Sequence, residues 1–359
     1  MSRRLNARAL ARCATALLLV ASTTPVRADD SPTRGDPPPA DAGYRLGDGF
    51  QIPGTGFHLG GYATASYGDP KDAPDRAAID NASLFVWWEG DSRWKFFSEL
   101  ELENPLYSRS SERGDVHEEN GYVSLERLYV DYALTETIAI RGGKFLTPIG
   151  RWNLVHATPL VWTTSRPLIT TLVFPTNMTG LMLTQTLPGL GEGVDYSIYG
   201  STGDELHPNP ELDTFSSAIG AHVNIPFLSG AQLGFSAADF EQEKTRFERK
   251  QLLGVDFSWS HNRFELSAEA VYRFSDQGST RDEKGAFAQL VAPLSERLYA
   301  VGRYETFRVA AERTATQLLV TGLNYRITPA LVLKAEWISS RHNQIHTPDG
   351  LLCSIAVLL

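Results

Sequence analysis

The sequence predicts an all-β fold: a transmembrane antiparallel β-barrel of about sixteen strands, with short turns at one end and longer loops at the other. Three observations lead to this prediction. From Phe57 onward apolar and polar side chains alternate with a period of two. The alternating segments are about ten residues long, and short turns and long polar links follow one another in turn along the chain.

The composition is compatible with this fold and excludes several others. The chain has 359 residues, a formal charge of −9, 42% hydrophobic residues and two cysteines. This hydrophobic content argues against disorder, and two cysteines are too few for a disulfide scaffold. The acidic balance gives no support to nucleic-acid binding. Outside the extreme N-terminus no apolar run approaches the ~18–20 residues of a membrane-spanning helix, which excludes a helical membrane protein.

The first 28 residues have the layout of a secretory signal peptide. Four arginines precede the apolar stretch 14–21, and small residues lead to a cleavage position after Ala28. The alternative is an amphipathic N-terminal helix of the folded domain. We therefore expect a signal peptide over 1–28, a flexible Pro- and Gly-containing segment over 29–56, and the barrel over 57–359.

Alternation is clearest in 94–103, 264–274 and 331–338, where one face carries Trp, Phe and Leu and the other carries charges. The same pattern predicts sixteen strands: 57–67, 78–89, 94–103, 121–134, 137–146, 178–187, 192–201, 214–226, 231–240, 250–260, 263–274, 285–293, 297–308, 313–327, 331–340 and 351–359. Seven tight turns and eight mostly longer loops connect them.

A soluble all-β protein is the competing interpretation, because its strands also alternate. Three features favour the membrane barrel: aromatic residues lie along nearly every apolar face, almost all neighbours join through hairpins, and tryptophans cluster near strand ends. The last strand, 351–359, is suited to closing the barrel against the first. It ends in Leu359, whereas outer-membrane barrels commonly end in an aromatic residue.

One block of residues resembles a known family. The segments Arg127–Tyr132 (RLYVDY) and Ile140–Asn153 (IRGGKFLTPIGRWN), with later Arg-Pro, Phe-Pro and Thr-Gly pairs, resemble the porin O/P family, the phosphate-selective porins. The resemblance covers residues 57–205 well. It implies a homotrimeric outer-membrane channel of a Gram-negative-type bacterium, through which small hydrophilic solutes or ions diffuse passively. Phosphate selectivity in that family relies on basic residues that line the pore.

The longest loop, 147–177, follows the fifth strand, where a porin loop commonly folds inward and narrows the channel. It contains Arg151, His156 and Arg166 and no acidic residue. Basic side chains without counter-charges suit a constriction that attracts anions. The alternatives are a solvated outer loop and a structural plug whose arginines pair with wall acids such as Glu99, Glu101 and Glu103.

The alternation also assigns charged residues to the lumen. The acids are Glu99, Glu101, Glu103, Asp131, Asp195, Asp256, Glu265, Glu269, Glu305 and Glu336, and the bases are Lys95, Arg127, Arg141, Arg273, Arg303, Arg326 and Lys334. Because acids outnumber bases, we do not carry over the family's phosphate selectivity. The charges could instead pair across neighbouring strands and stiffen the wall. Lys144 falls on the outward phase, which a local bulge or a position beyond the lipid would explain.

No motif indicates catalysis or a cofactor. The histidines form neither an HExxH nor a paired-cysteine metal pattern, and His342 and His346, four residues apart, lie in a predicted loop. Neither a nucleophile elbow nor a phosphate-binding loop is present. We expect a channel that is not an enzyme and that binds no nucleic acid, with outer-membrane lipid and small solutes or ions as its partners. A barrel-embedded hydrolase and a plugged structural or adhesion barrel remain the alternatives.

Overall fold

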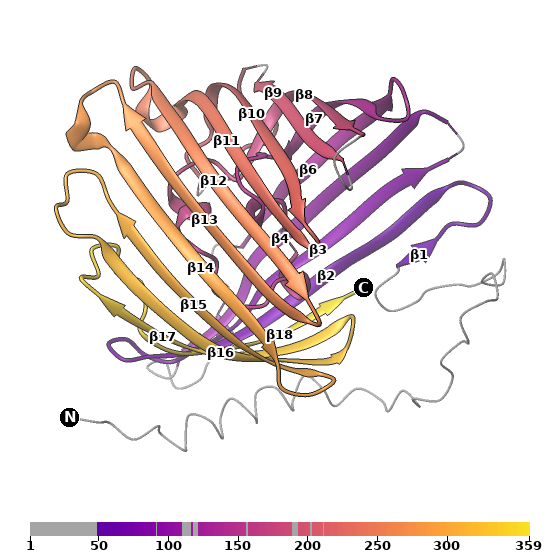
Figure 1. Cartoon of the computed structure of the whole chain (residues 1–359). Coiled ribbons are helices and arrows are strands. Elements are labelled where there is room, and N and C mark those ends of the chain that lie inside the picture. Colours follow the sequence, from indigo (N-terminus) through magenta and orange to yellow (C-terminus); the bar gives the residue numbers. More distant parts are fainter. Residues whose placement is uncertain are drawn as a thin grey trace.

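The computed structural model describes residues 49–90, 92–109, 116–117, 121–155, 157–188, 193–201, 203–210 and 212–359 (Figure 1). The predicted signal peptide and residues 29–48 lie outside this part of the chain. Among the described residues, no helix is long and apolar enough to cross a membrane.

One antiparallel sheet closes on itself to form the barrel. Within the described chain sixteen long strands build its wall: β2 (Phe57–Pro70), β3 (Arg76–Glu89), β4 (Trp94–Arg109), β6 (Tyr122–Ala133), β7 (Ile138–Leu146), β8 (Asn177–Leu187), β9 (Val194–Ser201), β10 (Phe215–Leu228), β11 (Ala231–Gln242), β12 (Lys250–His261), β13 (Phe264–Ser275), β14 (Glu283–Pro293), β15 (Leu298–Arg308), β16 (Thr316–Thr328), β17 (Leu331–Arg341) and β18 (Gly350–Leu358). The two-residue strands β1 (Phe50–Gln51) and β5 (Val116–His117) pair with β2 and β4. The predicted fold class is confirmed, and every predicted strand corresponds to an observed one.

The last strand closes the barrel, as predicted. β18 pairs with β2 from Gly350↔Pro70 to Leu358↔Tyr62. Beyond the strand, the Leu359 N–H donates to the Gly61 carbonyl at 2.7 Å. Closure satisfies the backbone groups of both end strands, which would otherwise form exposed edges.

The outer face of the wall is apolar over much of its height. Leu84, Leu181 and Ile219 are 50%, 57% and 61% exposed, although their neighbours along each strand are more buried. A soluble protein rarely leaves so many large apolar side chains exposed, whereas lipid would cover them.

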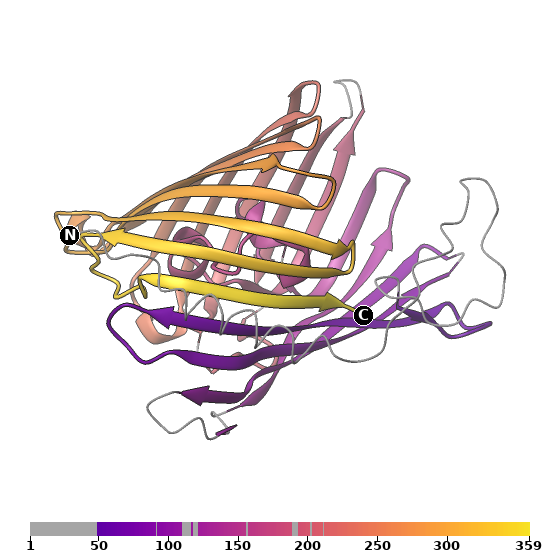
Figure 2. The same cartoon turned by 90° about the horizontal axis from the view of Figure 1, so that it is seen from below.

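The connection between β7 and β8, which we call the inner loop (residues 147–176), folds into the barrel. It contains three short helices, η2 (Trp152–Leu154), η3 (Thr158–Leu160) and α2 (Leu168–Leu172). In both views these coils lie between opposite parts of the wall (Figures 1 and 2). α2 contacts β14 and β15, and η3 contacts β2 and β18, so the loop reaches strands far from its own ends. The remaining helical turns, η4 (Glu243–Thr245) and η5 (Ser279–Arg281), lie in outer loops.

The apolar core lies inside the barrel, between the inner loop and one side of the wall. Its loop members include Ile149, Ile169 and Val173, and its wall members include Phe287 and Phe307. This packing fixes the loop against β10 to β16, because each of these side chains is removed from water.

Candidate functional site

Three wall carboxylates hold the inner loop by its backbone. Each accepts hydrogen bonds from loop N–H groups, and such charge-assisted bonds are stronger than neutral ones. The pairs are Glu269 with Arg151 (2.9 Å) and Trp152 (2.6 Å), Glu305 with Leu168 (2.7 Å), and Glu336 with Thr164 (3.1 Å) and Ser165 (2.8 Å). These acids, which the alternation assigned to the lumen, therefore bind loop backbone.

Wall cations hold the same loop by its oxygen atoms. Lys334 Nζ donates to the Thr158 carbonyl at 2.6 Å, and an Arg273 guanidinium nitrogen donates to the Val173 carbonyl at 3.0 Å. Arg303 Nη2 donates to Ser165 Oγ at 2.7 Å, while its Nε lies 2.7 Å from Glu305 Oε1. Arg303 is 1% exposed, so water does not screen this pair. Here both signs of charge are used to position the loop.

Trp162 anchors the middle of the inner loop. Its indole N–H donates to Glu265 Oε2 at 2.6 Å, and its carbonyl accepts from Asn324 at 3.0 Å. The Arg326 guanidinium stacks over its ring, 4.1 Å from the centroid. Arg326, another predicted lumen residue, therefore also contacts the loop.

The predicted constriction residues do not gather in one place. Arg151 donates to Asn224 at 3.3 Å and to Gln232, and it borders a cavity of about 820 Å³ formed largely by β11 to β13 and the turn before β11. Arg166 lies over the Trp152 ring, 4.7 Å from its centroid, and borders a different cavity. Neither guanidinium makes an ion pair within the described chain. His156 lies outside the described residues.

On the opposite side of the lumen, the predicted charges pair along the wall. Arg127 Nε lies 2.5 Å from Glu99 Oε2. Arg141 binds Asp131 through two hydrogen bonds of 2.7 and 2.8 Å, from Nε and Nη2. Cross-strand pairing, the alternative that the sequence left open, is thus observed on β4, β6 and β7.

Between this wall and the inner loop lies a cavity of about 490 Å³. Its charged lining residues are Arg76, Asp80, Glu101, Glu103, Glu126 and Arg166. Glu101 accepts from the Tyr62 hydroxyl at 3.0 Å, and Glu103 accepts from Asn209 at 3.0 Å. Burial lowers the pKa of Arg166, and its attraction to Glu126 and Glu101 opposes this effect. We call this space the acidic cavity.

Glu126 is a lining residue that strict alternation misses. In the pairing of β4 with β6, Glu99 lies opposite Arg127 and Leu100 lies opposite Leu125, which leaves Glu126 as a bulged residue. The bulge lets the consecutive residues Glu126 and Arg127 both contact interior groups. No pattern of period two could have indicated this.

Lys144 and Glu205 form a second site that the sequence did not predict. Lys144 Nζ lies 2.5 Å from Glu205 Oε1, donates to the His207 carbonyl at 3.1 Å, and is 1% exposed. The pair ties β7 to the loop between β9 and β10. Burial raises the pKa of Glu205, and Lys144 opposes the rise. The outward phase of Lys144 therefore does not expose it to lipid.

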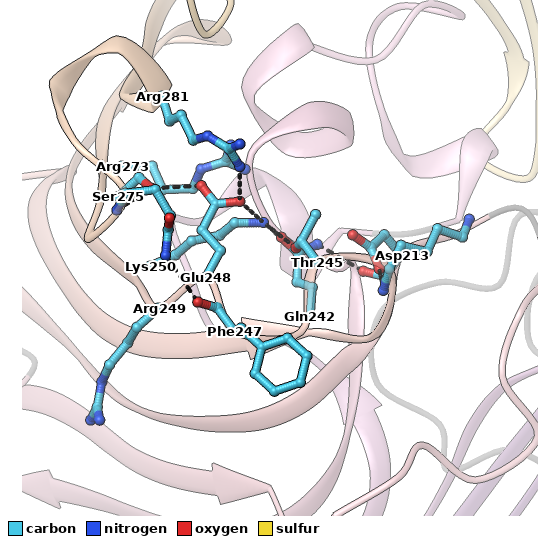
Figure 3. Close-up of polar contacts among 12 residues, drawn as sticks. Asp213, Gln242, Thr245, Phe247, Glu248, Arg249, Lys250, Arg273, Ser275 and Arg281 are labelled. Carbon is cyan, nitrogen blue, oxygen red and sulfur yellow. Dashed lines mark hydrogen bonds and ion pairs between the residues drawn. The ribbon is translucent and has the colours of Figure 1, made fainter.

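A network of polar contacts connects two outer loops at the end of the barrel that carries the long loops (Figure 3). Glu248 accepts from Ser275 Oγ at 2.6 Å and from Arg281 at 3.3 Å. Lys250 Nζ donates to Gln242 and Thr245, both at 2.7 Å, and lies 3.9 Å from Glu248 Oε2. These contacts link the loop after β11 to the loop after β13.

The arrangement places charged side chains of the wall and of the inner loop around cavities inside the barrel. In the part of the chain that the structure covers, no group of three or more His, Cys, Asp or Glu residues is placed to hold a metal ion. What the geometry provides is a loop fixed by wall charges and at least two cavities inside a barrel.

Comparison with known proteins supports the fold. No family model matches the chain, so the resemblance to porin O/P stays a prediction. A protein described as uncharacterized from Aquifex aeolicus (strain VF5) is 30% identical over 123 residues, which cover 34% of this chain and 27% of that protein.

Solved structures of outer-membrane proteins are similar in fold. The anion-selective porin from Comamonas acidovorans superposes with a TM-score of 0.55 and 13% identity over 84% of this chain and 98% of the porin. The trimer form of OmpT, an outer membrane protein of Vibrio cholerae, gives a TM-score of 0.59 and 7% identity over 84% and 99%. The chain therefore has the barrel fold of outer-membrane porins.

Proposed function

We propose that this protein is an outer-membrane channel of a Gram-negative-type bacterium, through which small hydrophilic solutes or ions diffuse passively. The observation that carries the proposal is the inner loop, which wall charges and an apolar core hold inside a closed barrel. A loop fixed in this way narrows the lumen permanently, without a conformational change. The end of the barrel with the short turns, where β18 also ends, would face the periplasm.

We also propose that the acidic cavity is the constriction and that it prefers cations. Four acids and two arginines contribute its charged lining, and a narrow low-dielectric passage strengthens such an imbalance. This preference is opposite to the phosphate selectivity of the family that the sequence resembles. Porins of similar fold include a trimer form, and we propose a homotrimer here as well.

Planar-bilayer recording of the purified full chain tests the proposal. We expect discrete current steps and, in a salt gradient, a reversal potential that indicates cation preference. Absence of steps would reject the channel and leave the plugged structural or adhesion barrel and the barrel-embedded hydrolase. Steps with anion preference would keep the channel and reject the acidic cavity as its filter.

A further inference from the structure

A groove lies on the outward face of β12 to β15, near the end that carries the long loops. It encloses about 660 Å³, and its floor includes Leu253, Val255, Ala270 and Ala286. These strands lie side by side on one wall (Figure 1). The small side chains of Ala270 and Ala286, which lie opposite each other on β13 and β14, leave the wall hollow at this point.

Strand register shows that the charged rim of the groove faces away from the lumen. Arg273 and Glu283 lie opposite each other and form an ion pair of 2.8 Å, and Arg273 also binds the inner loop. Their sequence neighbours Tyr272 and Lys284 lie opposite each other on the other face. Lys284 in turn lies opposite Arg308 of β15.

Three cations border this groove: Lys284, Arg308 and Arg313 of the following loop. None of them makes an ion pair within the described residues. Lys284 lies over the Tyr272 ring, 5.8 Å from its centroid. Like charges directly opposite on neighbouring strands repel each other, so Lys284 and Arg308 destabilise the free sheet locally.

The described carboxylates near the groove do not form ion pairs with its three cations. Asp282 accepts from the Tyr272 hydroxyl at 2.9 Å and from the Ser275 N–H at 3.0 Å. Glu283 pairs with Arg273 on the inner face. Glu312 is exposed and adjoins Arg313 in sequence, without an ion pair to it. The rim of the groove is therefore positive.

We propose that this groove binds an outer-leaflet lipid with a phosphate-bearing headgroup, its phosphates on Lys284, Arg308 and Arg313 and an acyl chain on the apolar floor. The proposal rests on the outer-membrane location proposed above. Lys284 is the second residue of β14 and Arg308 is the last of β15, so the cations lie at the loop end of the wall, where headgroups meet the apolar belt. An apolar floor that includes the exposed Leu253 suits a lipid rather than a free anion.

Native mass spectrometry of the full chain in detergent tests this inference. Diphosphorylated lipid A, which carries two anionic phosphates, is the probe, and phosphatidylethanolamine, whose single phosphate is balanced by its ammonium group, is the comparison lipid. We expect lipid A to be retained in preference, and the triple variant Lys284→Gln, Arg308→Gln, Arg313→Gln to bind it at least about tenfold more weakly, since each hydrogen bond between charged groups contributes to binding. Ala270→Trp, which fills the floor without changing charge, should weaken binding as well.

The matched control is Arg93→Gln, Arg263→Gln, Arg297→Gln, which removes the same charge from exposed turns at the opposite end. An equal loss in this control would show general attraction and overturn the proposal, as would unchanged binding in the Ala270 variant. Displacement of lipid A by millimolar inorganic phosphate would identify a free-anion site instead. Bilayer conductance of the same variants tests the channel proposal alone, because none of these residues borders the acidic cavity.

Discussion

The Glu269 carboxylate on β13 accepts the backbone N–H of Trp152 at 2.6 Å, across 117 positions of sequence. The same oxygen accepts the Arg151 N–H at 2.9 Å. One wall side chain thus fixes the point at which the inner loop turns into its first helix. Replacing Glu269 by Ala should free this turn, because two loop donors lose their partner inside the barrel.

We expect Glu269→Ala to lower the free energy of unfolding by about 1–3 kcal/mol, measured by thermal denaturation in detergent. Single-channel currents should become noisier as the loop fluctuates. Glu312→Ala, on the surface, is the control and should change neither quantity. A quiet channel of normal stability in the Glu269 variant would show that apolar packing alone fixes the loop.

The buried pair of Arg303 and Glu305 should behave asymmetrically on mutation. Arg303→Met leaves the Glu305 carboxylate buried beside a neutral side chain, and we expect a loss of about 3–5 kcal/mol. The double variant Arg303→Met, Glu305→Leu should lose less than the single variant, because no uncompensated charge remains. A double-mutant cycle of unfolding free energies measures this difference, and strict additivity would contradict it.

Arg166→Ala should increase the cation preference of the channel. It removes one of the two arginines that border the acidic cavity and leaves all four acids. The reversal potential in a salt gradient measures the shift. Arg151→Ala is the matched control, because Arg151 borders another cavity, and we expect a smaller shift. Equal shifts in both variants would mean that the whole loop, rather than the acidic cavity, sets the preference.

Glu205 should make stability depend on pH. Burial raises its pKa, so the folded protein holds a proton there at pH values at which an unfolded chain, with an ordinary Glu pKa of about 4.3, has lost it. The stability that protonation contributes is present at low pH and is lost as pH rises through the raised pKa. Relative to Glu205→Gln, the wild type should gain stability as pH falls through this window. Parallel pH profiles would refute the shift.

Gly143 is required by its backbone conformation. Its φ is +128°, and a Cβ atom there would lie 2.2 Å from the Leu128 carbonyl oxygen. Gly143→Ala should therefore cost about 1–3 kcal/mol of stability or more. The neighbouring Gly142→Ala is the control, since its added Cβ would meet only Leu181 Cδ2 at 3.4 Å. Similar unfolding temperatures in the two variants would contradict this account.

The barrel could be predicted from the order of apolar and polar residues. A period of two, sustained over sixteen segments, can be satisfied only by strands with one apolar and one polar face, and the alternation of short and long connections orders them as hairpins. Each predicted strand corresponds to an observed one because this information is local. The length of the inner loop and its place after the fifth long strand agreed with a porin loop that folds inward, but they left a solvated outer loop equally open until the structure was known.

The partners of the charged residues could not be predicted from the same pattern. Glu305 and Lys334 face inward as alternation predicts, but their loop partners lie 137 and 176 positions away in sequence. Glu126 enters the acidic cavity through a bulge, and Lys144 is buried by a distant loop. Alternation predicts whether a side chain faces the lumen or the lipid. The partners of that side chain depend on the path of the inner loop, whose sequence has no regular pattern. Some acidic residues of the chain thus bind the inner loop, and others line the acidic cavity.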